Sequence, residues 1–588
     1  MNGAGAAFLA IPEALVLGLI AAGAGRRICA RLLPDASSPE QSVFGFPVGM
    51  ALLSVLMTGL LFAGLPAVAL PFVLGAVLIA AAAWGRMEAV DIVRDLGQIA
   101  RESPGLAAIV AASAVLGLVG CLAPETGWDT GVYHFAMARI RAEQGGMVVR
   151  PDVPHGYRPA SLEALHSVGF VLNGESLASM INESFYFAGL GLARLWGFRL
   201  AGPRGGFFAA LAWLSSITYV LRMDGGDVEV GQTVYLGVAL LALLRLRDGG
   251  GSGWRILAGL ALGMFVGMKY ASLYATVLVA AAWLVIRIRD RTALRVLLAD
   301  GVVIGAFLVV IACPWYLRNK LVMGSWFYPY GAAAAGGAGG EAAADEGSAR
   351  AVLQCLGMDG LIVVGAIGLL VPWVARDRWT GIVAILLPLW TLRQMGGSTA
   401  NIFNAFRYAS PGWLPLLVFA GTGAAWGLQR PGLVRFLGIG ALLGAAVLGQ
   451  GVLVKRNLPK LPAALGLVTR TDYLDQRITS HRALREAETG LPAGKRILLV
   501  EERVYYCRAP FLAASDLQDV VDFGRFGTAE EFRHFLDAES IGAIVVDRTS
   551  NAKVWRFRDL ERRLGAAWPI SGVRPVTVPG DASLYRVE

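Results

Sequence analysis

Long apolar stretches separated by short polar segments dominate the chain up to about residue 454. A helix needs about 20 mainly apolar residues to cross the roughly 30 Å hydrocarbon core of a bilayer. Runs near that length predict about 14 transmembrane helices, some of them short. The predicted runs are 7–24, 46–63, 67–84, 105–123, 177–196, 205–221, 228–244, 255–268, 270–286, 296–316, 351–374, 380–392, 411–428 and 433–453.

The pattern changes in the last part of the chain. The segments "RILLVEE" (496–502) and "IGAIVVD" (541–547) are typical of strands, and "TAEEFRHFLDAES" (528–540) between them is typical of a helix. Thr528 and Glu531 have the spacing of a capping box at the start of that helix. A small α/β domain is therefore predicted. No phosphate-binding glycine motif opens a helix after either strand, which argues against nucleotide binding and favours a lid or a partner-docking role.

Composition supports this division. Hydrophobic residues make up 56% of the 588 residues and charged residues only 16%, against about 25% in soluble domains. Of the 52 basic and 43 acidic residues, 21 and 18 lie in 455–588, so the rest of the chain is poorer still. Such a body needs lipid as its solvent, which excludes a water-soluble enzyme and a disordered chain. The net charge of +9 does not indicate nucleic-acid binding, because the basic residues lie between apolar runs.

We therefore predict a polytopic α-helical membrane protein with a small C-terminal α/β domain outside the cytoplasm. Residues 1–104 would form three N-terminal transmembrane helices, residues 105–454 a transmembrane core with a first large outer loop at 124–176, and residues 455–588 the soluble domain. The five cysteines have no metal-ligand spacing, so they indicate neither a zinc site nor a disulfide framework.

The distribution of arginine predicts the orientation in the membrane. Arginines gather in every second connection between apolar runs, for example at Arg26, Arg27 and Arg31, and such connections face the cytoplasm. The alternate connections are longer and include 124–176 and 317–350. Both termini, these loops and the C-terminal domain are therefore expected to face outward. In a bacterium this means an inner-membrane protein whose outer face lies in the periplasm.

The first large outer loop carries the strongest candidate for chemistry. In "PETGWDTGVYHFAMARIRAEQGGM" (124–147), Asp129 and Tyr133 are four residues apart and share one face if a helix begins there. An acid at the membrane surface, roofed by apolar residues, could serve as a general base. The alternative is structural: Thr126 and Asp129 fit the pattern of a helix start, which would make Asp129 a capping residue.

The same loop holds three of the five histidines, His134, His155 and His166. Together with Asp129 and Glu163 they could collect a divalent cation. Their spacing matches no metal motif, so ordinary hydrogen-bonding histidines are the alternative, and no cofactor is predicted with certainty.

Further charged residues lie at the outer ends of the predicted spans. "RMDGGDVEVGQ" (222–232) brings Asp224, Asp227 and Glu229 into one short connection, either as a solvated turn or as a site for substrate hydroxyls or a cation. Lys269 lies between two apolar runs, a costly position that indicates function or a snorkelling anchor. Arg318, Arg407 and Tyr408 continue the series, singly as interface residues. Together they describe a pocket for an anionic headgroup whose tail stays in the bilayer.

The order of these features resembles a known family. Asp129 followed by Tyr133 and His134, then "GMKYASL" (267–273) and "RNKLVMGSWFYPY" (318–330), is similar to the lipid-phosphate-dependent glycosyltransferases of the GT-C superfamily. The likeness covers roughly residues 105–420. It departs from the family in two ways: three predicted helices precede the one that leads into the loop, and Thr130 stands where protein O-mannosyltransferases have a second acid.

The resemblance implies a transferase that passes a sugar from a polyprenyl-phosphate or polyprenyl-diphosphate donor to a glycan, lipid or protein acceptor at the outer face. The first-loop acid is the usual candidate base in that family, and this role carries over to Asp129 alone. We expect inversion at the anomeric carbon. The residues assigned to the donor and its phosphate are Tyr133, His134, Lys269, Arg318, Arg407 and Tyr408, and those assigned to the acceptor are His155, Arg158, Asp224 and Asp227.

Other readings of the sequence stay open. A secondary transporter or lipid flippase has similar hydropathy, but the polar candidates here gather at one membrane face and no repeated halves are visible. An O-antigen ligase or polymerase also uses lipid-linked glycans, and a non-catalytic assembly or sensor protein would act through the C-terminal domain. The sugar, the acceptor and the metal requirement are not predicted.

Overall fold

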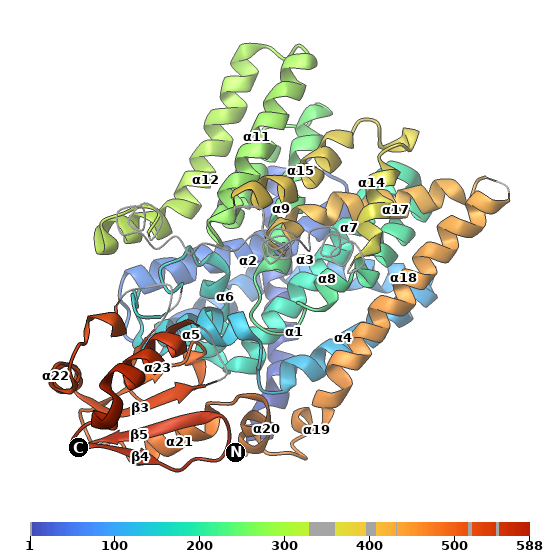
Figure 1. Ribbon diagram of the computed structural model, residues 1–588. Helices are drawn as coiled ribbons and strands as arrows, with labels where there is room; N and C mark the ends of the chain where they lie inside the picture. The colour runs from blue at the N-terminus through green and yellow to red at the C-terminus, as the bar shows by residue number, and fades with distance from the viewer. Residues whose placement is uncertain are drawn as a thin grey trace.

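A computed structural model describes residues 3–153, 155–328, 359–394, 407–430, 432–514, 520–548 and 552–588. Helices fill most of it, and a single five-stranded sheet lies near the C-terminal end of the chain. Both termini lie at the same end of the molecule, and the hairpin of α11 and α12 projects at the opposite end (Figure 1).

The first four helices are α1 (Gly3–Leu32), α2 (Ser38–Phe62), α3 (Leu70–Glu102) and α4 (Pro104–Leu122). Small residues allow α1 and α2 to approach closely. A Cβ on Gly49 would lie 1.9 Å from the carbonyl oxygen of Ala21, and one on Gly25 would lie 1.9 Å from that of Gly45. Gly45 and Gly49 form a GxxxG pair, the spacing typical of tightly packed helices in membranes.

The central helices follow the first outer loop. They are α7 (Glu175–Ser215), α8 (Ile217–Val220), α9 (Glu229–Arg247), α10 (Gly253–Val266), α11 (Ala271–Arg289) and α12 (Leu294–Met323). The range of α7 holds two of the predicted runs as separate helical segments, joined by a turn at Ala201 and Gly202 directly before Pro203. The two segments lie side by side, because the indole N–H of Trp213 donates a hydrogen bond of 3.0 Å to the carbonyl oxygen of Tyr186. Helix α9 is buried along nearly its whole length, so the other helices pack around it.

The later membrane helices are α14 (Gly360–Gly368), α15 (Arg378–Gln394), α17 (Leu414–Gly427) and α18 (Leu433–Asn457), with short 3-10 turns η3 (Pro372–Val374) and η4 (Ser410–Trp413). Every predicted apolar run coincides with a helix wherever the structure describes it. Seven helices in the described ranges are long and apolar enough to cross a membrane, and three shorter apolar helices accompany them. The predicted polytopic helical class is confirmed.

The C-terminal region begins with short helical segments that follow α18. They are η5 (Leu458–Lys460), α19 (Leu461–Ala464), α20 (Arg470–Arg477) and α21 (His481–Thr489). The strands are β1 (Arg496–Val500), β2 (Phe511–Ala513), β3 (Ile541–Asp547), β4 (Val573–Val576) and β5 (Ala582–Val587), and between them lie η6 (Val504–Tyr506), η7 (Phe523–Arg525), α22 (Ala529–Ala538), α23 (Ala552–Leu564) and η8 (Gly565–Ala567). The predicted small α/β domain is confirmed.

The sheet has the order β2-β1-β3-β5-β4. Strands β1, β2 and β3 are parallel, whereas β5 runs antiparallel to both β3 and β4. The two predicted strands became β1 and β3, and the predicted capping box at Thr528 and Glu531 opens α22.

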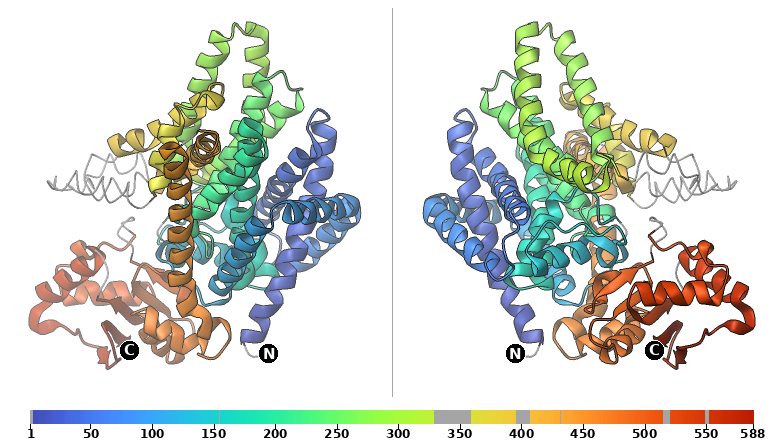
Figure 2. Two further views of the ribbon diagram at one scale, coloured as in Figure 1. Left: turned by 90° about the vertical axis from the view of Figure 1, so that its right-hand side faces the viewer. Right: turned by 90° about the vertical axis from the view of Figure 1, so that its left-hand side faces the viewer.

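The first outer loop folds into the π-helical turn η1 (Thr130–His134) and the helices α5 (Phe135–Gln144) and α6 (Ser161–Leu172). It does not lie apart from the C-terminal domain. Phe135, Met137 and Ile140 of α5 share one apolar core with Ile497 and Leu499 of β1. Two side views show this domain beside the lower ends of the membrane helices (Figure 2).

Candidate active site

Asp129 lies at the start of the turn that follows α4. The carboxylate of Glu125 accepts hydrogen bonds from the backbone N–H groups of Thr126 (2.8 Å) and Gly127 (2.5 Å), so Glu125 satisfies the donors at this helix start. Asp129 makes no side-chain capping hydrogen bond. The capping alternative is therefore wrong for Asp129, whose carboxylate is left to point into the site.

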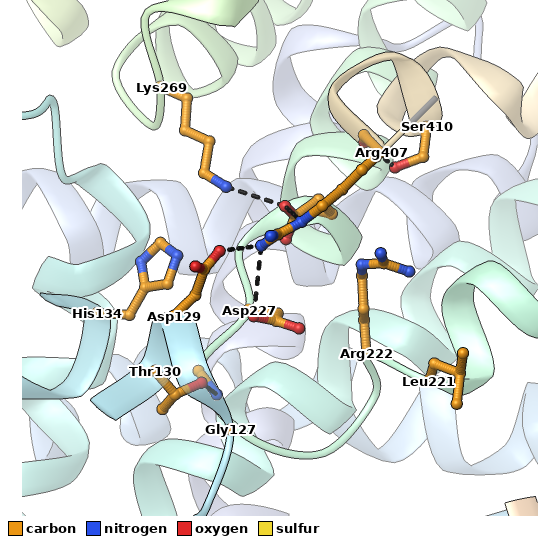
Figure 3. A network of polar contacts seen from close by, with 12 residues as sticks. Gly127, Asp129, Thr130, His134, Leu221, Arg222, Asp227, Lys269, Arg407 and Ser410 are labelled. Carbon is orange, nitrogen blue, oxygen red and sulfur yellow. Dashed lines mark hydrogen bonds and ion pairs between the residues drawn. The ribbon is translucent and has the colours of Figure 1, made fainter. Parts of the chain in front are cut away.

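Arg407, shortly before η4, lies among three carboxylates from distant parts of the chain. It contacts Asp129 directly, its Nε lies 3.0 Å from Oε1 of Glu229, and a terminal nitrogen lies 3.9 Å from Oδ1 of Asp227. Figure 3 shows the guanidinium directed between Asp129 and Asp227. The planar fork of arginine suits this task, because it can serve several acceptors at once.

Lys269 completes the cluster from the connection between α10 and α11. Its Nζ lies 2.9 Å from Oε1 of Glu229, the first residue of α9, and 5.8 Å from the centre of the Tyr408 ring. The predicted residues Asp129, Lys269, Arg407 and Tyr408 thus come together around Glu229. Three carboxylates and two cations leave the cluster close to neutral, and both cations are already ion-paired.

Asp129 of the first outer loop and Asp227 of the connection before α9 have different electrostatic surroundings. Burial alone would raise the pKa of Asp129, but the positive charges of Arg407 and Lys269 outweigh it and hold the pKa below its usual value. Burial, followed by the nearby charge of Glu229, raises the pKa of Asp227. Two carboxyl groups whose pKa values are shifted in opposite directions suit different roles, and Asp129 is the one that stays in its charged, basic form.

His134 offers a ligand atom beside these aspartates. Its Nδ1 lies 2.6 Å from Oε1 of Glu163, and its Nε2 is buried without a hydrogen-bond partner among the described residues. One ligand atom each from Asp129, His134 and Asp227 lies within 4.8 Å of the others. A carboxylate behind a histidine is the usual support of a metal ligand. These three residues could hold a divalent cation, and in the described ranges His155 and His166 do not belong to the group.

A second group of predicted residues surrounds Tyr133. The ring centre of His155 lies 4.9 Å from that of Tyr133, and the guanidinium carbon of Arg158 lies 5.6 Å from the same ring centre. Arg318 donates to the carbonyl oxygens of Tyr157 and Arg158. In the described part of the chain Arg318 forms no ion pair, so it fixes the loop that carries His155 and Arg158 instead of facing the carboxylates.

Asp224 is separated from the cluster despite its short distance in sequence from Asp227. Its two carboxylate oxygens lie 2.8 Å from Arg456 and 2.8 Å from Lys460, at the end of α18 and in η5. Asp224 therefore ties α18 to the connection before α9, and of these two aspartates only Asp227 lies beside Asp129.

Sequence reasoning assigned no site role to Glu125 or Arg222, and it offered Glu229 only as one of three acids that could bind substrate hydroxyls or a cation. In the structure Glu229 bridges the two cations Lys269 and Arg407. Arg222, whose positive charge lies near Asp227 and Glu229, is shown near Asp227 in Figure 3. Glu125 was missed as the capping residue, because Thr126 and Asp129 fit the sequence pattern of a helix start.

Comparison with known proteins supports the fold. No family model matches the sequence, and no curated protein matches it. Among solved structures, apo ArnT from Cupriavidus metallidurans is similar over 82% of this chain and 98% of its own, with a TM-score of 0.54 and 15% identity. The same enzyme bound to undecaprenyl phosphate gives the same coverage, a TM-score of 0.55 and 14% identity. At these identities the likeness concerns the fold alone, and the chain has an ArnT-like fold.

Proposed function

We propose that this protein is a membrane glycosyltransferase that moves a sugar from a polyprenyl-phosphate carrier to an acceptor at the outer face of the membrane. The observation that carries the proposal is the partly buried carboxylate of Asp129, on the first outer loop of an ArnT-like fold, which is held in its charged form by its ion pair with Arg407. The ArnT structure with undecaprenyl phosphate supports a polyprenyl carrier for this chain also.

The proposed reaction is a single displacement with inversion. Asp129 takes the proton of the acceptor hydroxyl as that oxygen attacks the anomeric carbon, and the bond between that carbon and the phosphate oxygen breaks. The phosphate leaves with the electron pair, so no acid partner is needed, in contrast to an inverting glycosidase. Positive charge from Lys269 and Arg407 stabilises the phosphate as its charge develops.

The other predicted residues take supporting parts in this proposal. Tyr133, His134 and Tyr408 stay assigned to the donor, and His155, Arg158 and Asp227 to the acceptor. Contacts of Tyr133 with His134, His155 and Arg158 bring the two sets together, which supports a site where donor and acceptor meet. Arg318 acts through the loop at Tyr157 and Arg158, whose carbonyl oxygens it binds.

The proposed location is the inner membrane, with the active site and the C-terminal domain in the periplasm. The arginine-rich connection between α11 and α12 lies at the end of the molecule opposite both termini (Figure 1), which supports this orientation. Single cysteines introduced at Arg291 and at exposed Arg574 should react from opposite sides of sealed vesicles.

We also propose a divalent cation at Asp129, His134 and Asp227, where it would add positive charge for the lipid phosphate. Glu163→Gln is expected to weaken Mn²⁺ binding about 10- to 100-fold, because Glu163 orients the His134 ring. Electron paramagnetic resonance of Mn²⁺ titrated into the purified protein measures this. Equal binding by wild type and Glu163→Gln, or no binding by wild type, contradicts the cation site.

Purified protein in lipid nanodiscs tests the whole proposal. Incubation with radiolabelled polyprenyl-phosphate sugars and an envelope extract as acceptor should release free polyprenyl phosphate and label the acceptor. Movement of an intact lipid-linked sugar across a vesicle membrane, with no cleavage, would instead support the transporter reading. Transfer of only preassembled oligosaccharides would support the ligase reading.

A further inference from the structure

The C-terminal domain is packed directly against the turn that carries Asp129. From this contact we infer that the domain is a fixed support of the active site, and that Tyr506 and Arg503 are positioning residues for the Asp129 turn. The inference rests on the proposed function for its catalytic meaning, and on the contacts alone for its structural meaning.

Tyr506 makes the most direct connection. Its hydroxyl donates a hydrogen bond of 2.6 Å to the carbonyl oxygen of Glu125, whose carboxylate in turn holds the N–H groups of Thr126 and Gly127. Asp129 follows two residues after Gly127. A single hydroxyl of the C-terminal domain therefore anchors the peptide from which the catalytic turn begins.

The stem of Arg503 supports the next residues of the turn. A Cβ placed on Gly131 would lie 3.4 Å from Cγ of Arg503 and 3.5 Å from Cε2 of Tyr506, so the turn lies against both side chains. Gly131 belongs to η1, and π-helical turns of this kind are rare and common at functional sites. A methyl group at this position would make ordinary contacts, whereas a larger side chain would meet Arg503 and Tyr506.

Arg503 is itself held rigidly by the sheet. Its Nε lies 3.4 Å from Glu501, directly after β1, and a terminal nitrogen lies 3.3 Å from Asp547, the last residue of β3. Both carboxylates are almost fully buried. The carboxyl ends of two parallel strands thus fix the side chain that meets the turn.

The shared core argues against a domain that swings as a lid. Alternate residues of β1 face opposite sides of the sheet. Leu498 and Val500 lie in one core with residues of α22 and α23, whereas Ile497 and Leu499 lie in a second core with residues of α21 and of α5. Lifting the domain away from the loop would expose the apolar surface that α5 shares with this second core, such as the contact of Phe135 with Tyr505, which apolar burial opposes. The predicted lid role is therefore replaced by a static one in this inference.

Polar contacts lock the same interface around its edge. Glu175 at the start of α7 accepts from Tyr505 and Arg470, each at 2.5 Å, and Arg139 of α5 donates to the carbonyl oxygen of Cys507 at 2.7 Å. Asp152 of the loop accepts from the backbone N–H of Ala513 at 3.0 Å. These bonds join the loop to β2, η6 and α20 at once.

The test is Tyr506→Phe in the full-length protein, with Tyr585→Phe as the matched control. The control loses a hydroxyl that is bonded within the domain, to Glu561 and Arg548. Loss of the bond to Glu125 should speed amide hydrogen exchange in residues 126–134 about 5- to 10-fold, the range for one hydrogen bond. It should lower kcat by a similar factor and leave the KM for the lipid donor unchanged. Tyr585→Phe should change neither quantity.

A second variant changes the residue of the turn that Arg503 and Tyr506 contact. Gly131→Leu places a side chain where Arg503 and Tyr506 lie and should lower kcat further, whereas Gly131→Ala, which the space admits, should retain most activity. Unchanged exchange of the 126–134 amides in Tyr506→Phe overturns the inference. If the amides respond but wild-type protein transfers no sugar, the support role stands and the proposed function fails.

Discussion

Asp129→Asn is expected to lower the rate of sugar transfer by about 10²- to 10⁴-fold, the range attributed to a positioned general base. The amide has the shape of the carboxyl group but cannot take the acceptor's proton. Binding of the lipid donor should fall less than the rate of transfer, because Lys269 and Arg407 remain for its phosphate even if the proposed divalent cation loses Asp129 as a ligand. Single-turnover rates with a radiolabelled polyprenyl-phosphate sugar, together with a separate measurement of donor affinity, distinguish these effects.

A matched control for that variant is Asp475→Asn in the C-terminal domain. Asp475 is also bonded to an arginine and a histidine, at 2.7 Å from Arg485 and 2.5 Å from His481, but far along the chain from the site. It should retain full transfer activity. An Asp129→Asn protein that assembles in the membrane and transfers sugar at the wild-type rate would remove Asp129 from the chemistry.

Most of the fold could be predicted from the sequence, because segments in lipid and segments in water have different patterns of apolar residues. Apolar runs of near-membrane length became helices wherever the structure describes them, and the β-branched runs at 496–502 and 541–547 became β1 and β3. The runs at 177–196 and 205–221, predicted as two helices, are two helical segments of α7 that turn back on each other at Ala201 and Gly202. The neighbouring glycine and proline at 202 and 203 mark this turn in the sequence.

The sequence predicted several of the residues of the candidate site, but not which of them contact one another. Asp129 and Arg407 are 278 positions apart, and no local pattern shows that they touch. What marked both residues in the sequence was a charged side chain at the outer end of an apolar run, a position with a high free-energy cost. The same signal also selected Asp224 and Arg318, which the fold uses to tie segments together. Burial and direction of a side chain, which decide between these roles, depend on tertiary packing.

The role of the C-terminal domain could not be predicted from the sequence for a related reason. Apolar residues such as Phe135 were expected to roof the acid at the membrane surface. In the structure Phe135 lies in one core with residues of the C-terminal domain, among them Tyr505 of η6. Amphipathic patterns predict that a face is buried, but not which partner buries it.

Arg407→Gln is expected to lower transfer about 10²- to 10³-fold, the range for loss of one preorganised charge in an active site. The variant removes the ion pairs of Asp129 and Asp227 with Arg407, whereas Glu229 keeps its ion pair with Lys269. Because breaking a buried ion pair typically costs about 3 kcal/mol or more, the thermal midpoint should also fall. Arg407→Lys should recover part of the stability and less of the activity, since an ammonium group cannot contact three carboxylates with the same fork.

The pH profile separates the electrostatic role of Arg407 from simple loss of structure. In the wild type the positive charge of Arg407 holds the pKa of Asp129 below its usual value against the effect of burial. The base is therefore charged throughout the neutral range, and activity should fall only in acid. Without Arg407 burial dominates and the pKa of Asp129 rises, so the acidic limb of kcat moves toward neutral pH. A loss of activity by the same factor at every pH would show that Arg407 serves the leaving phosphate or the fold and does not tune the base.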